Sequence, residues 1–295
     1  MKLIILVATF FIFTSNCIAQ ELLQSLFYST IRLECYENDT INGHVHSIKT
    51  NATGFFFILN IDGNYTPTIV TTAHAVKQAE KVILTFTASK KDTFLPDNKR
   101  TVIKRLSSFN KYWIYHPTYD LAICPLAAIF GDKIYNSREI YYKAFSEQNI
   151  VNLNKQTNGI EINSIEDILM IGYPKGIWDS VNNLPILRKG ITATPLPLNY
   201  LGKSQILADI PVYGGSSGSP VLLYKYGTFF GNNSIIANGG EVVFLMGICS
   251  EDLEGNFSSK NDSNNMITKL PLNLAIVIKA ERILDFVDII KNHKK

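Results

Sequence analysis

Residues 214–223 have the sequence GGSSGSPVLL, a turn-forming stretch that runs directly into an apolar segment. Glycines on both sides of Ser217 allow a tight turn, because glycine adopts left-handed backbone conformations without a steric penalty. Pro220 ends the turn, and the apolar run Val221–Leu223 is typical of a buried strand. A flexible glycine–serine loop would not be followed at once by proline and a buried strand. The stretch therefore predicts an ordered turn in a strand-rich fold.

The rest of the chain also consists mainly of short strand-like segments. β-Branched and aromatic runs, separated by turn residues, form two series. The first series is Phe55–Leu59, Thr68–Thr71 and Lys81–Phe86, and the second is Ile168–Tyr173, Leu187–Thr194, Gln205–Ala208, Val221–Tyr224 and Val242–Cys249. Closely spaced strands with few helical periods predict an all-β fold of barrels or sandwiches.

Three other regions complete this organisation. Strand signals thin out over residues 131–166, where we place the connection between the two series. Residues 231–241 and 251–265 are rich in glycine, asparagine and serine, and we expect surface loops there. Apolar residues at helical spacing near the end predict an amphipathic helix that packs on the strands; they are Ile283, Phe286, Val287 and Ile290.

The first residues are typical of an export signal. Leu3–Phe13 is apolar, follows the positive Lys2 and is shorter than the ~20 residues that span a bilayer. Small residues follow, and we expect cleavage after Ala19, with an extracytoplasmic mature protein and no stable membrane association. Leu22, Leu23, Leu26 and Phe27 then predict a short helix.

Composition narrows the possible functions. Hydrophobic residues make up 46% of the chain and charged residues 18%, which indicates a packed core. The net charge of +3 is too small to argue for nucleic acid. Cys35, Cys124 and Cys249 lie among apolar residues, so we expect buried thiols and no disulfide framework. No acidic cluster has calcium-ligand spacing, and we predict no metal or other cofactor.

Ser217 is the candidate nucleophile. A serine hydroxyl needs a base, and it needs backbone N–H groups that stabilise developing negative charge. His74, at the end of the strand Thr68–Thr71 and between small residues, is the candidate base. Asp120 precedes the apolar run Leu121–Ile123 and is the candidate carboxylate that orients the histidine. His116 precedes Pro117, as is common in a surface turn.

These segments together resemble the trypsin/chymotrypsin-like serine protease family. The matches are Thr72-Ala73-His74-Ala75, Asp120-Leu121-Ala122-Ile123 and Gly215-Ser216-Ser217-Gly218-Ser219-Pro220, in the order base, orienter and nucleophile. Ala52–Phe55 resembles the strand before the histidine strand in bacterial members, and Leu245–Ser250 resembles the strand that lines the substrate pocket.

The resemblance implies two antiparallel β-barrels with the active site between them. We expect a signal peptide over residues 1–19, barrels over 20–145 and 146–278, and a C-terminal helix over 279–295. The resemblance also implies a secreted serine endopeptidase that acts on protein or peptide substrates, with an oxyanion hole formed by the N–H groups of Gly215 and Ser217. The substrate-binding candidates are Pro211, Ser250, Glu251 and Asp252. Pro211, at the floor of the primary pocket, does not support trypsin-like specificity.

One departure concerns activation. Ser216 replaces the aspartate that pairs with a freed amino terminus in animal digestive relatives, and no Ile-Val-Gly-Gly start follows the signal peptide. The chain looks closer to the bacterial DegP-like and glutamyl-endopeptidase group, without a PDZ domain. We expect the protein starting at Gln20 to be active without a second processing step.

Two alternatives remain. Residues 214–218 also satisfy Gly-x-Ser-x-Gly, with Ser216 as the nucleophile of an α/β-hydrolase. That fold needs an acid and then a histidine after the serine, and the only later histidine is His293. The other alternative is a secreted pseudoprotease that keeps the barrels as a binding scaffold; all three triad residues are present, which disfavours it.

Overall fold

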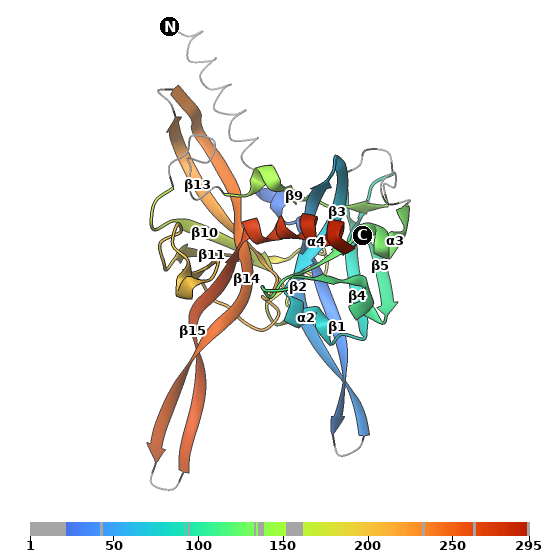
Figure 1. The fold of residues 1–295 in the computed structure, drawn as a ribbon, viewed down its shortest axis with the longest axis vertical. Coiled ribbons are helices and arrows are strands. Elements are labelled where there is room, and N and C mark those ends of the chain that lie inside the picture. The colour runs from blue at the N-terminus through green and yellow to red at the C-terminus, as the bar shows by residue number, and fades with distance from the viewer. Residues whose placement is uncertain are drawn as a thin grey trace.

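A computed structural model describes residues 22–41, 44–91, 93, 95–132, 134, 139–151, 162–231, 234–261 and 264–293. The predicted signal peptide lies outside these residues. Most of the described chain is strand, arranged as two sheets side by side with a C-terminal helix packed across them (Figure 1). Within the described residues, no helix has the length and apolar character needed to cross a bilayer.

The first half of the chain forms a nine-stranded sheet in the order β5-β4-β1-β2-β3-β7-β6, with β8 on β4 and β9 on β2. Its pairs are antiparallel, except for β2 with β9. Its strands are β1 (Thr30–Ile41), β2 (His44–Ile61), β3 (Asn64–Thr71), β4 (Lys81–Ser89), β5 (Pro96–Ser107), β6 (Ile114–Tyr115), β7 (Ala122–Pro125), β8 (Ile140–Tyr141) and β9 (Phe145–Ser146). Short helices interrupt them at α2 (Ala73–Lys77), η1 (Phe109–Tyr112) and α3 (Leu126–Phe130).

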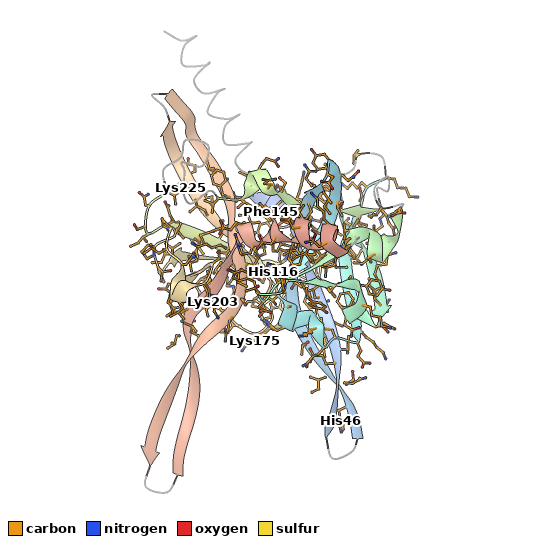
Figure 2. The ribbon with its side chains drawn as sticks, viewed as in Figure 1. His46, His116, Phe145, Lys175, Lys203 and Lys225 are labelled. Carbon is orange, nitrogen blue, oxygen red and sulfur yellow. The ribbon has the colours of Figure 1, made fainter. Side chains whose placement is uncertain are left out.

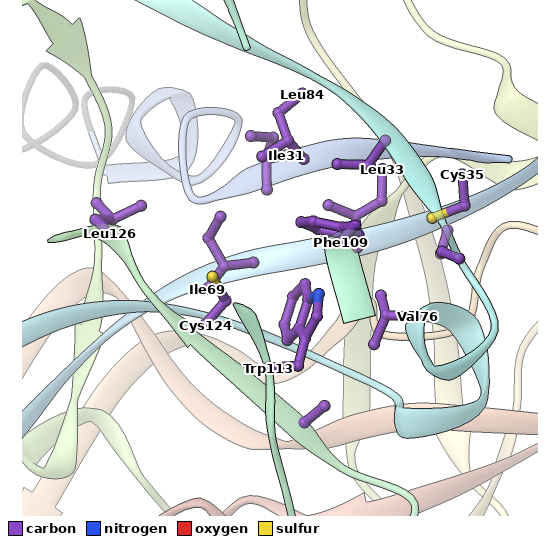
Figure 3. Packing of buried hydrophobic residues seen from close by; sticks show 14 of the residues in the cluster. Ile31, Leu33, Cys35, Ile69, Val76, Leu84, Phe109, Trp113, Cys124 and Leu126 are labelled. Atoms are coloured by element: carbon purple, nitrogen blue, oxygen red, sulfur yellow. The ribbon is translucent and has the colours of Figure 1, made fainter. Parts of the chain in front are cut away.

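Aromatic and aliphatic side chains fill the core of this sheet (Figure 3). Phe109 is fully buried and meets Trp113 edge to face, with ring centroids 5.3 Å apart. Cys35 and Cys124 lie in the same core as free thiols, and Cys249 is buried in the core of the second half. The expectation of buried thiols is therefore confirmed for all three.

The second half forms a closed barrel in the order β10-β11-β12-β15-β14-β13. Its strands are β10 (Asp167–Gly172), β11 (Ile186–Thr192), β12 (Gln205–Asp209), β13 (Pro220–Gly231), β14 (Ser234–Asn261) and β15 (Asn264–Lys279). Single helical turns are η3 (Glu147–Asn149), η4 (Pro174–Gly176), η5 (Tyr200–Gly202) and η6 (Ala280–Ile283), and η6 leads into α4 (Asp285–His293). The predicted all-β architecture with a C-terminal helix is confirmed, and it matches a chymotrypsin-like double barrel.

A third apolar cluster joins the two halves. It includes Phe55 and Phe57 of the first sheet, Ile171 of the barrel, and Phe286 of α4, all fully buried. Residues 22–26 form the expected short helix, and Leu26 enters the same cluster. This shared core holds the two halves together.

The structure corrects two expectations about loops. Residues 234–241 and 251–261 are strand, as parts of long β-ribbons that project from the body (Figure 1). The connection predicted over residues 131–166 contains β8 and β9. In an antiparallel ribbon each strand satisfies the backbone of the other, so polar residues that suggest loops are compatible with strand.

Candidate active site

His74 and Asp120 meet because of how β3 and β7 pair. Thr71, at the end of β3, pairs with Ala122, at the start of β7, so the residues just beyond Thr71 lie beside those just before Ala122. His74 Nδ1 is 2.6 Å from Asp120 Oδ2, and the His74 backbone N–H donates to Asp120 Oδ1 at 2.9 Å. The carboxylate accepts, so Nδ1 carries a proton and the other ring nitrogen, Nε2, keeps its lone pair.

Charge and burial set the protonation behaviour of this pair. The hydrogen bond that His74 donates to Asp120 raises the pKa of His74 above its usual value, against the opposing effect of burial. Burial by itself would raise the pKa of Asp120, but hydrogen bonds from His74 and from the Ser250 hydroxyl outweigh it and lower that pKa. The Ser250 hydroxyl donates to Asp120 Oδ2 at 2.8 Å. The His74 side chain is 54% exposed, so its Nε2 edge is accessible to a substrate.

The turn that carries Asp120 is organised around His116. Nδ1 of this ring accepts the backbone N–H groups of Thr118 and Tyr119 at 3.1 and 3.0 Å, and Nε2 lies 3.1 Å from Asp285 Oδ2 in α4. The side chain is only 5% exposed and lies beneath α4 (Figure 2). His116 therefore lies in a turn, one of the two expected settings, but its side chain is not on the surface because α4 packs over the turn.

The loop that carries Ser217 is held by its neighbours in both halves. The Ser217 carbonyl accepts the N–H of Thr53 at 2.9 Å, and the Gly218 N–H donates to the Cys249 carbonyl at 2.8 Å. Gly218 has a φ of +86°, and a Cβ there would collide with the Thr53 carbonyl and the Thr71 hydroxyl. A side chain at position 218 would therefore push the loop away from β2 and β3.

Two carbonyl groups in this loop accept hydrogen bonds from backbone N–H groups. The Gly214 carbonyl accepts the N–H of Lys175 at 2.5 Å, and the Ser216 carbonyl accepts the N–H of Ser219 at 3.0 Å. In a trans peptide the C=O and the following N–H point in opposite directions. The N–H groups of Gly215 and Ser217 therefore point away from these contacts, and neither donates a hydrogen bond within the described residues.

Thr53 supports the same loop with its side chain. Its buried hydroxyl donates to the Gly215 carbonyl at 2.8 Å and accepts the N–H of Tyr173 at 3.0 Å. A Cβ on Gly215, which has a φ of +92°, would approach the Tyr173 carbonyl to 2.5 Å. Gly215 is thus fixed by Thr53 on one side and by the turn after Tyr173 on the other.

A short chain of contacts links the three candidate catalytic residues. Gly218, next to Ser217, binds the Cys249 carbonyl, and the following residue Ser250 binds Asp120, which in turn binds His74. The Ser217 side chain is partly exposed, and its hydroxyl makes no hydrogen bond with any described residue. The structure therefore joins His74 to Asp120 directly, and leaves Ser217 in the same site without a hydrogen bond to His74.

The substrate-binding candidates occupy different settings. The Pro211 carbonyl accepts a hydrogen bond from Arg188, and Ser250 is buried against Asp120. Glu251 is exposed in β14, and its charge contributes to raising the pKa of His74. The backbone of Asp252 belongs to β14, but its side chain lies outside the described part of the structure.

Comparison with known proteins identifies the family. A trypsin-like peptidase domain matches residues 52–231, which is more than half of the chain. The chain therefore belongs to the trypsin-like peptidase domain family. No curated protein matches it. The matched region includes His74, Asp120 and Ser217, and it supports a peptidase function of the serine-protease type.

Sequence reasoning missed several residues that shape this site. Thr53 belonged to a matched segment, but no pattern in the sequence indicates that its hydroxyl holds Gly215. Arg188 lies in β11 and contacts the loop that carries Ser217, and His116 pairs with Asp285 across the fold. These contacts join segments far apart in the sequence, so spacing and periodicity carry no signal for them.

Proposed function

We propose that this protein is an exported serine endopeptidase that hydrolyses peptide bonds through His74, Asp120 and Ser217. The observation that carries the proposal is the His74–Asp120 pair, in which one carboxylate binds both the ring Nδ1 and the backbone N–H of the histidine. This arrangement fixes the tautomer that leaves Nε2 free to accept a proton. The outward-pointing N–H groups of Gly215 and Ser217 add the second requirement, stabilisation of an oxyanion.

The proposed reaction has two halves. In the first, His74 Nε2 takes the Ser217 proton as Oγ attacks the substrate carbonyl carbon, and the carbonyl oxygen becomes an oxyanion bound by the N–H groups of Gly215 and Ser217. When the tetrahedral intermediate collapses, the imidazolium gives its proton to the leaving amine and an acyl-Ser217 ester remains. In the second half, His74 takes a proton from water, the hydroxide attacks the ester, and the proton returns to Oγ as the acid product leaves.

The missing hydrogen bond between Ser217 and His74 is compatible with this reaction. Catalytic hydrogen bonds are often long or poorly aligned in free enzymes and become shorter when the substrate is bound. The same observation is also the one that favours the second candidate, a secreted pseudoprotease that uses the double barrel as a binding scaffold. Direct chemical labelling separates the two.

The test is labelling with a fluorophosphonate, which reacts with an activated serine. We expect the wild-type chain to be labelled at Ser217 and to hydrolyse a denatured protein substrate. Ser217→Ala should abolish both, whereas Ser216→Ala should keep measurable activity. A wild-type protein that is folded but neither labelled nor active would support the pseudoprotease, and labelling at Ser216 would overturn the assignment of the nucleophile.

Substrate selection belongs to the same proposal. We propose that Pro211 forms the floor of the primary pocket, that Ser250 lies beside the bound substrate backbone, and that Glu251 and Asp252 line the approach to it. A small or medium apolar side chain is the substrate residue that this floor favours. A cleavage profile on a peptide library tests the preference, and dominant cleavage after lysine or arginine would contradict it.

A further inference from the structure

Arg188 of β11 contacts the loop that carries Ser217. Nη1 donates to the Pro211 carbonyl, and Nη2 donates to the Ser216 hydroxyl at 2.7 Å. The guanidinium carbon lies 5.8 Å from the centroid of the Tyr213 ring. One side chain therefore touches the beginning, the middle and the end of the segment 211–216.

The acceptor on Ser216 is fully enclosed. Ser216 has no exposed surface, and its hydroxyl also accepts the N–H of Tyr213 at 3.3 Å, while its own N–H donates to the Tyr213 carbonyl at 2.9 Å. The loop thus folds around the Ser216 hydroxyl, and Arg188 is the charged donor that reaches it. Within the described part of the chain, no carboxylate lies within ion-pair distance of Arg188, so its two directed contacts are both to this loop.

Arg188 binds the residue that lies between the two proposed oxyanion donors. Ser216 lies between Gly215 and Ser217, whose N–H groups point outward for the reasons given above. When the Ser216 side chain is held inward, the two adjacent N–H groups remain on the opposite side of the loop. A guanidinium suits this role because its planar fork makes two directed hydrogen bonds at once, which a lysine ammonium on one stem cannot reproduce.

Resting on the proposed function, we propose that Arg188 is a positioning residue that holds the segment 211–217 in its oxyanion-binding form. In relatives that need processing, an acidic residue at the position of Ser216 pairs with a newly formed amino terminus. In this chain the neutral Ser216 accepts from a cation that β11 already supplies. The site is therefore complete without cleavage of the mature chain.

The test compares three variants. Arg188→Met keeps an unbranched stem against Tyr213 and removes both hydrogen bonds, and Arg188→Lys keeps the charge but reaches at most one acceptor. Arg100→Met is the matched control, because Arg100 is an exposed arginine of β5 that contacts Asp97 and the Ser89 carbonyl. Each protein is assayed for kcat, KM, thermal stability and amide hydrogen exchange over residues 211–218.

We expect Arg188→Met to lower kcat by about 10²-fold, the order found when an oxyanion donor is lost. KM should change by less than about threefold, because the effect falls on the transition state. Exchange at the amides of 213–218 should become faster, Arg188→Lys should recover part of kcat, and the control should match the wild type. A purely structural role would lower the melting temperature while leaving the kcat of the folded protein unchanged.

The proposal is overturned if Arg188→Met keeps kcat within about threefold of wild type and shows unchanged exchange in the loop. If Arg188→Met does not fold, Ser216→Ala and Arg188→Lys decide the question in the same way, since each removes one of the two contacts.

If the wild type is neither labelled nor active, the proposed function fails, whereas the exchange comparison still decides whether Arg188 orders the loop. The intact mass of the labelled wild type tests whether the site is complete without cleavage of the mature chain. Labelling confined to chains shortened beyond Gln20 would contradict this.

Discussion

Replacing Thr53 by valine tests how the loop that carries Gly215 and Ser217 is supported. Valine has nearly the same shape as threonine, so the substitution removes the hydroxyl with little change in volume. Two buried groups would lose their partner, the Gly215 carbonyl at 2.8 Å and the Tyr173 N–H at 3.0 Å. An unsatisfied buried polar group costs about 1–3 kcal/mol, so the free energy of unfolding should fall by about 2–6 kcal/mol.

The effect on catalysis should exceed what the stability loss explains. Without the Thr53 hydroxyl, the Gly215–Ser216 peptide loses a hydrogen bond that holds it, and the Gly215 and Ser217 N–H groups on either side of that peptide become less well ordered. We expect kcat to fall at least about tenfold, but by less than the roughly 10²–10³-fold found when an oxyanion donor is removed outright. The assays are urea unfolding and steady-state kinetics at a temperature where the variant is fully folded.

Thr68→Val is the matched control. Thr68 is a fully buried threonine of β3 whose hydroxyl donates to the Phe57 carbonyl at 3.0 Å, away from the nucleophile loop. It should lose about 1 kcal/mol of stability with unchanged kcat. If Thr53→Val keeps the wild-type kcat in the same way, the reasoning that Thr53 orients Gly215 is refuted.

Four further predictions concern the site and its surroundings. Asp120→Asn should lower kcat by about 10⁴-fold, as in other triads with a mis-set tautomer, with the fold intact. Because Asp120 raises the pKa of His74, kcat/KM of the wild type should begin to fall at a pH above the reference histidine value of ~6.5. In Asp120→Asn this fall should shift to lower pH. An unchanged pH profile would show that Asp120 does not act on His74. Asp285→Asn should cost about 1–3 kcal/mol by weakening the contact with His116, and urea unfolding that shows no loss would contradict the support that α4 gives to the Asp120 turn. Cys35 is fully buried with a thiol pKa raised to about 12, so it should react with a thiol reagent only after unfolding, and reducing agents should leave activity unchanged; rapid reaction in the native state would count against this packing.

The sequence predicted those features that depend on neighbouring residues. Strand periodicity, the turn around Ser217 and the apolar stretch after Asp120 are local patterns, and they led to the all-β fold. The helical spacing of apolar residues near the end predicted α4 for the same reason. The ribbon strands over 234–241 and 251–261 were mistaken for loops, because local composition does not show that another strand pairs with them.

Local patterns thus predicted the class of fold, the family and the candidate residues His74, Asp120 and Ser217. The contacts that hold these residues in place became visible in the folded chain. Thr53 and Gly215 are separated by 162 positions and His116 and Asp285 by 169, yet each pair is joined by a hydrogen bond. Such contacts depend on the register of the sheets and on the core shared by the two halves. A residue's own neighbours in the chain do not encode that register, because it results from packing across the whole molecule.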